Sequence, residues 1–93
     1  MEDMETIIKG KITLFSKSKC TSCERAIKVL TENNIDFDIM KLEENEEYIL
    51  EKARTIRNSQ MPFCEIDNTL YNAQNTMKII DYIKKKESVI KNE

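Results

Sequence analysis

The chain has 93 residues, of which 15 are basic and 17 are acidic, so its net charge is -2. So small an imbalance gives no electrostatic basis for binding nucleic acid or an anionic membrane surface. Histidine is absent from the sequence, which excludes a Cys–His nucleophile, a histidine general base and any zinc site that contains imidazole.

The first ten residues, MEDMETIIKG, are acidic and lack the apolar stretch of a signal peptide. No stretch of the chain approaches the roughly 18 apolar residues that are needed to span a bilayer. We therefore expect a cytoplasmic protein, in a compartment that keeps thiols reduced. There, three cysteines fit a catalytic role better than a disulfide scaffold, which would need more of them and an even number.

Seven segments of the chain carry the hydrophobic period of a strand or a helix. In chain order these are a strand at 11–15, a helix at about 21–32, a strand at 35–40, a helix at 43–56, strands at 63–66 and 69–71, and a helix around 77–83. Phe37 and Ile39 alternate in the second strand, whereas Met77, Ile80 and Ile83 recur at helical spacing. Asp67–Asn68 is a turn signal between the last two strands.

The element order βαβαββα determines the topology that we expect. A strand, a helix and a second strand of these lengths imply a right-handed crossover and parallel pairing. The two later strands are joined by a tight turn and must run antiparallel. The sequence thus predicts an α/β fold of thioredoxin-like arrangement, a four-stranded mixed sheet flanked by three helices. It forms one domain over residues 1–93, with its core at about 10–86.

Cys20 and Cys23 lie where the first strand gives way to the first helix. A helix that begins at about residue 21 points its unsatisfied amides at Cys20, and these donors stabilise a thiolate. Lys17 and Lys19 add positive charge nearby. Thiols so placed have pKa values of about 3.5–7.5 rather than about 8.5. Cys20 would then attack a disulfide sulfur, and Cys23 would resolve the mixed disulfide.

Two other interpretations of this pair remain. A C-x-x-C motif is also half of a zinc site, but a second pair is then required, and only Cys64 is left. The two cysteines could instead be small buried core residues. Cys64 itself alternates away from the active-site edge by strand periodicity, which favours a place in the core.

The sequence resembles the glutaredoxins. The stretch "ITLFSKSKCTSCERAIKVL" is similar to their first strand, active-site loop and first helix, and "SQMPFCEIDNTLYN" is similar to their cis-proline segment and final hairpin. The resemblance extends over residues 11–83. It implies that Cys20 is the nucleophile, that Cys23 is the resolving residue and that Pro62 follows a cis peptide bond.

The resemblance also implies a set of residues that contact substrate or glutathione. These are Lys17, Thr21, Ser22, Arg57, Met61, Pro62, Asn75 and Thr76. Among them, Lys17 and the Met61 backbone would hold a glutathione moiety as an added strand. No bound cofactor or metal is expected, and glutathione is the expected reductant.

The chain departs from the family pattern at two places. Most glutaredoxins have Pro-Tyr between the cysteines, and Thr21–Ser22 stands there in this chain. After the last strand they carry Gly-Gly followed by Asp, whereas this chain has Asn-Ala-Gln-Asn-Thr at 72–76. Ala73 adds a side chain where glycine is usual, and Asn75 or Thr76 replaces the carboxylate. A neutral hydrogen bond there is about half as strong as a charge-assisted one.

The expected function is reduction of protein or glutathione mixed disulfides by a monomer that uses dithiol exchange. One alternative is a hydrogen donor for ribonucleotide reductase that takes electrons from thioredoxin reductase, which the stretch "RNSQMP" partly resembles. Further alternatives are a redox-inactive binding module and a dimeric iron–sulfur scaffold held by Cys20 and glutathione. An arsenate-reductase-like relative would need several arginines near one cysteine, and only Arg25, Arg54 and Arg57 are present.

Overall fold

The computed structural model describes residues 4–56 and 60–91, with side chains described at 5–56 and 60–86. In chain order, the helices and strands are α1 (Met4–Ile7), β1 (Ile12–Ser16), α2 (Thr21–Glu32), β2 (Phe37–Lys41), α3 (Glu46–Ala53), β3 (Phe63–Ile66), β4 (Thr69–Tyr71) and α4 (Ala73–Lys91). The predicted strands and helices are all present, and the fold class is confirmed.

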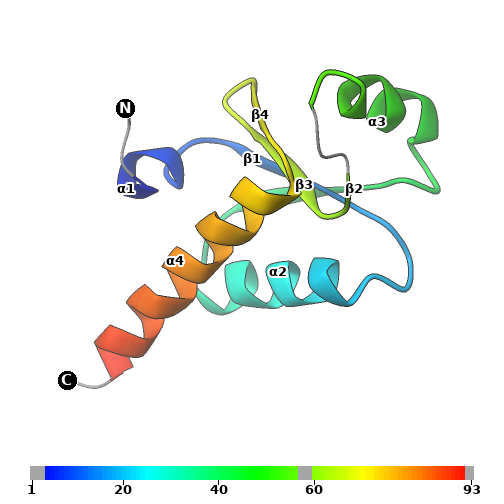
Figure 1. Ribbon diagram of the computed structural model, residues 1–93. Coiled ribbons are helices and arrows are strands. Elements are labelled where there is room, and N and C mark those ends of the chain that lie inside the picture. Colours follow the sequence, from blue (N-terminus) through cyan, green and yellow to red (C-terminus); the bar gives the residue numbers. More distant parts are fainter. Residues whose placement is uncertain (1–3, 57–59, 92–93) are drawn as a thin grey trace.

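The four strands form one mixed sheet in the order β2-β1-β3-β4. β1 pairs with β2 in parallel and with β3 antiparallel, and β3 pairs with β4 antiparallel. The pairing of β1 with β2 follows from the crossover through α2, as the sequence predicts. Figure 1 shows α2 and α4 together below the sheet, and α3 on the other side.

Each face of the sheet has its own buried cluster, because successive residues of a strand point to opposite faces. Ile12 and Leu14 of β1 pack with Cys64 of β3 against α2 and α4. Phe15 and Phe63 point the other way and pack against Ile49 of α3. Their two rings lie 4.8 Å apart between centroids. A fully buried side chain of this size contributes about 1.5–3 kcal/mol, so the two aromatic residues help to hold α3 on the sheet.

The prediction of three helices is wrong by one, because residues 4–7 form the additional helix α1. This single turn is too short for a local hydrophobic period to predict it. A contact distant in sequence holds it: the Tyr82 hydroxyl of α4 donates to Glu5 Oε1 at 2.9 Å, and Lys86 pairs with the same carboxylate.

Several predicted boundaries also move, and the hydrogen bonds explain two of them. The helix expected from residue 43 begins at Glu46, because residues 42–45 form a turn in which the Glu44 and Asn45 amides donate to the Lys41 carbonyl. The strand expected from residue 35 begins at Phe37, because Ile35 still donates its amide to the Leu30 carbonyl at the end of α2. Within the described residues, no helix is both long enough and apolar enough to cross a membrane.

Gly10, the only glycine of the chain, allows β1 to begin close to the β3–β4 turn. A Cβ at this position would overlap the Asp67 carboxylate and come within 2.7 Å of Ile66 Cγ2. Neither group can move freely, since Asp67 Oδ1 accepts the Lys11 amide at 2.9 Å and Ile66 is buried in the core.

We therefore predict that Gly10→Ala lowers the free energy of unfolding by about 1–3 kcal/mol, the usual effect of inserting a carbon into a packed site. Urea denaturation followed by circular dichroism measures it. Lys11→Ala is the control, because its side chain is exposed and its hydrogen bonds to Asp67 belong to the main chain. An unchanged denaturation midpoint in Gly10→Ala would show that the Asp67 side chain can move away from the new Cβ without loss of stability.

Candidate functional site

The register of the sheet brings three chain segments to one edge. Phe15 near the end of β1 pairs with Phe63 at the start of β3, and Cys64 pairs with Tyr71 at the end of β4. The loop at 17–20, the residues just before β3 and the start of α4 therefore leave the sheet at the same edge. All the residues that the sequence predicts for substrate contact belong to these segments or lie close to them in the chain.

Cys20 is the N-cap residue of α2. Its backbone is extended, with φ -116° and ψ 103°, and its sulfur accepts the Cys23 amide at 3.2 Å. A helix begins here because the carbonyl of Cys20 already accepts the first helical hydrogen bond, from Glu24. The amide and the positive end of the helix dipole both favour negative charge on the Cys20 sulfur.

Cys23 lies in the first turn of α2, where its side chain is 1% exposed, compared with 8% for Cys20. The two Cα atoms are 5.2 Å apart, and the sulfurs are joined in a disulfide. The spacing of one helical turn thus brings the two thiols within bonding distance, as the sequence predicts. The pair can store two electrons as thiols and release them by forming this bond.

The loop before Cys20 carries exposed basic and polar side chains. Lys17 and Lys19 are both exposed, and so are Thr21 and Ser22 between the cysteines. These exposed residues flank Cys20 in the chain, whereas Cys20 itself is only 8% exposed. Their predicted contacts with substrate stay predictions, because the structure contains only the protein chain.

The segment before β3 contributes backbone rather than charge. Met61 is half-buried and Pro62 is buried, and the peptide bond between them is cis, as the resemblance implies. Arg57, the remaining predicted contact on this side, lies outside the described residues.

The start of α4 changes the interpretation of the last predicted contacts. The Asn72 side chain caps the helix by accepting the Asn75 amide at 2.9 Å, and the Asn75 side chain is exposed. Thr76 is only 2% exposed, and its hydroxyl donates to the Tyr71 carbonyl at 3.1 Å. The Thr76 side chain therefore points into the core, and the predicted contact of this residue with substrate stays a prediction. Of the two candidates for the missing carboxylate, only Asn75 is accessible.

Cys64 is the third thiol and lies in the core, as predicted. Burial raises the pKa of the Cys64 thiol to about 11, although the nearby Thr76 hydroxyl, whose oxygen lies 3.4 Å from the Cys64 sulfur, acts in the opposite direction. A thiol with this pKa carries almost no thiolate at neutral pH. It is therefore inert in disulfide exchange while the protein is folded.

Sequence reasoning missed one residue at this edge. Glu43 follows β2, and its carboxylate Oε2 accepts the Ser18 amide of the loop before Cys20 at 2.8 Å. That hydrogen bond holds the pKa of the Glu43 carboxyl below its ordinary value, so it is ionised at neutral pH. From the sequence, Glu43 is one of several glutamates near a helix start, and no local signal distinguishes it.

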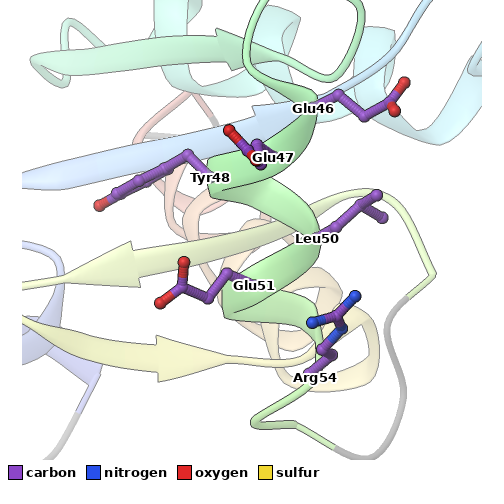
Figure 2. Close-up of a pocket in the computed structure, with 6 residues that line it drawn as sticks. All are labelled: Glu46, Glu47, Tyr48, Leu50, Glu51 and Arg54. Atoms are coloured by element: carbon purple, nitrogen blue, oxygen red, sulfur yellow. The ribbon is translucent and has the colours of Figure 1, made fainter.

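A groove on α3 lies apart from the residues described above. Figure 2 shows an open groove along the outer side of α3, lined by Glu46, Glu47, Tyr48, Leu50, Glu51 and Arg54. It contains no cysteine and none of the predicted contact residues. No group of three or more cysteine or acidic side chains within 4–56 and 60–91 is gathered closely enough to hold a metal ion.

Comparison with known proteins agrees with this geometry. The glutaredoxin family model matches residues 12–71. A dithiolic glutaredoxin from Trypanosoma brucei brucei has a similar structure, with a TM-score of 0.63 and 20% identity over 95% of each chain. A glutaredoxin from Archaeoglobus fulgidus has a TM-score of 0.55 and 17% identity over 86% of this chain and 96% of that one.

A Nu-class glutathione S-transferase from Haemonchus contortus is also similar, with a TM-score of 0.61 and 17% identity. The alignment covers 82% of this chain but only 35% of the transferase. At these identities the solved structures show the fold alone. No curated protein matches the chain.

The burial of Cys64 predicts a pH dependence of stability. Between about pH 8.5 and about 11 the unfolded thiol loses its proton while the folded thiol keeps it. The unfolded state then binds fewer protons, so the free energy of unfolding falls as the pH rises, by up to about 1.4 kcal/mol per unit. Urea denaturation at pH 8 to 11 measures this slope.

The comparison is between the double variant Cys20→Ser/Cys23→Ser and the same protein with Cys64→Ala, so that no disulfide can rearrange. Cys64→Ala also loses packing at every pH, and therefore the slopes are compared rather than the absolute values. Parallel curves for the two proteins would contradict the raised pKa.

Proposed function

This chain belongs to the glutaredoxin family, and we propose that it reduces disulfides by exchange through the Cys20–Cys23 pair. The observation that carries the proposal is the position of Cys20 at the start of α2, with its sulfur accepting the Cys23 amide. A sulfur so placed is favoured as a thiolate, which is the attacking species in disulfide exchange.

The exchange has two steps that balance in electrons and protons. The Cys20 thiolate attacks one sulfur of the substrate disulfide, forms a mixed disulfide with it and releases the other sulfur as a thiolate. Cys23 then gives up its proton and attacks the Cys20 sulfur, which forms the Cys20–Cys23 disulfide and releases the second substrate sulfur. The substrate gains the two electrons and the pair of thiols loses them.

Glutathione is the proposed reductant that restores the dithiol. Two glutathione thiols supply the two electrons, through a mixed disulfide on Cys20, and leave as one glutathione disulfide. Lys17 is exposed on the loop before Cys20 and carries a charge that a glutathione carboxylate can pair with. The Met61 backbone leaves the sheet at the same edge.

The proposed substrates are glutathione mixed disulfides and disulfides of proteins, in a reducing compartment such as the cytoplasm. Cys20 requires no cofactor for this chemistry. Experiment distinguishes three other functions. The protein could take electrons from thioredoxin reductase and pass them to ribonucleotide reductase, it could be a redox-inactive binding module, or it could be an iron–sulfur scaffold.

We predict that the protein reduces a small glutathione mixed disulfide when NADPH, glutathione and glutathione reductase are supplied. Cys20→Ser is expected to lose this turnover entirely, because the serine hydroxyl cannot attack the substrate. Cys23→Ser is expected to keep part of it, since glutathione can resolve the mixed disulfide on Cys20, but to lose reduction of protein disulfides. Consumption of NADPH at 340 nm measures both.

The outcomes separate the alternatives. No turnover with glutathione, combined with reduction of the protein by thioredoxin reductase, would assign it to the ribonucleotide reductase donors. Inactivity with both reductants would favour a binding module. Visible absorbance after anaerobic purification would point to the iron–sulfur scaffold, and a colourless reconstituted protein would exclude it.

The substituted loop before α4 generates a gain-of-function prediction. We predict that Asn75→Asp lowers the KM for glutathione about two- to tenfold, because a carboxylate forms a charge-assisted hydrogen bond with the glutathione amine. The same coupled assay, run over a range of glutathione concentrations, gives the KM.

Gln74→Glu is the matched control, since it adds the same charge one residue earlier on an exposed side chain in the first turn of α4. Both substitutions place a negative charge in the first turn, so their favourable interactions with the positive end of the helix dipole are similar. A KM that falls equally in the two variants would mean that Asn75 does not face the glutathione amine.

A further inference from the structure

Glu43 joins two loops that are distant in sequence. It lies just after β2, and its carboxylate accepts the Ser18 amide at 2.8 Å, with the Ser18 hydroxyl as a further donor. Beside it, the Leu42 amide donates to the Ser16 carbonyl at 2.8 Å, which extends the pairing of β1 and β2 by one bond. The side chain of Glu43 therefore fixes the chain beyond the point where the sheet ends.

The residues between this fixed point and Cys20 make a tight turn. Lys19 has φ 57°, in the left-handed region that a side chain with a Cβ rarely adopts. Cys20 then returns to an extended conformation and caps α2. Only one residue separates Ser18 from Cys20, so the position of the Ser18 amide restricts where the Cys20 sulfur can lie.

The two redox states differ in what holds Cys20. In the oxidised protein the bond to Cys23 fixes its sulfur against α2. Reduction breaks that bond, which leaves two of the constraints seen in the oxidised structure: the hydrogen bond from the Cys23 amide and the conformation of the loop. The hydrogen bond from Ser18 to Glu43 bears on the second of these constraints, and it does not involve either cysteine.

We propose that Glu43 is a positioning residue that holds the Cys20 sulfur at the start of α2 in the reduced protein. The inference rests on the proposed function, in which Cys20 is the attacking sulfur. Glu43 acts through Ser18 and Lys19. The positioning comes from the hydrogen-bond acceptor and not from the charge: a negative charge near Cys20 by itself disfavours the thiolate.

The test measures the reactivity of Cys20 directly. The reduced protein is treated with iodoacetamide at pH 7, and mass spectrometry of the peptides gives the alkylation rate at Cys20. Wild type is compared with Glu43→Ala, which removes the acceptor, and with Glu43→Gln, which keeps an acceptor oxygen but loses the charge. Glu44→Ala is the matched control, because this exposed neighbour carries the same charge.

Glu43→Ala is expected to slow alkylation of Cys20 about two- to tenfold, the range that the loss of one hydrogen bond produces. Glu43→Gln and Glu44→Ala are expected to react at least as fast as wild type. Urea midpoints of the reduced proteins accompany the rates. A purely structural role would lower the midpoint and leave the alkylation rate of the folded protein unchanged, which would overturn the inference.

The experiment needs no substrate and no glutathione, so it separates two kinds of failure. A wild-type Cys20 that reacts rapidly, together with an equally rapid Glu43→Ala or with equal slowing in Ala and Gln, overturns the inference alone. A wild-type Cys20 that reacts no faster in the folded protein than in urea overturns the proposed function together with the inference.

Discussion

The central position of β1 in the sheet is the constraint on which the site depends. β1 is paired on both sides, in parallel with β2 and antiparallel with β3. Its end therefore coincides with the end of β2 and the beginning of β3, and β4 returns to the same edge. A slip of one residue would move Leu14 and Phe15 each to the face that the other now occupies. The two buried clusters fix the register, and the register brings the site together.

The local signals of the sequence were sufficient for most of the fold. β3 and β4 have the predicted bounds, because the only proline and the Asp67–Asn68 turn mark them without help from distant residues. Both turn residues have a positive φ, which aspartate and asparagine tolerate better than most residues. The start of α2 at residue 21 is likewise local, since the helix needs a cap and Cys20 provides one.

The parts that the sequence did not reveal depend on contacts between distant segments. α1 is held by a hydrogen bond from Tyr82, 77 positions away, and the role of Glu43 depends on Ser18, 25 positions away. Thr76 is a similar case, because alignment with a family motif indicates a position and not the direction of a side chain. Its hydroxyl faces Tyr71 and Cys64. Where a side chain points follows from packing, which one-dimensional periodicity does not contain.

The three cysteines lie in different environments, and these environments determine which of them can react as a thiolate. The Cys20 sulfur accepts a hydrogen bond from an amide at the start of α2, and Cys23 is buried in the first turn of that helix. Cys64 lies on β3, in the buried apolar cluster between the sheet and helices α2 and α4. Because burial raises the pKa of the Cys64 thiol, a much smaller fraction of Cys64 is a thiolate at pH 7 than of an exposed cysteine. An ordinary exposed thiol would have a few per cent. Because exchange proceeds through thiolates, this difference prevents a third thiol of the same chain from competing for the Cys20 sulfur, so a pair of cysteines can cycle beside a third.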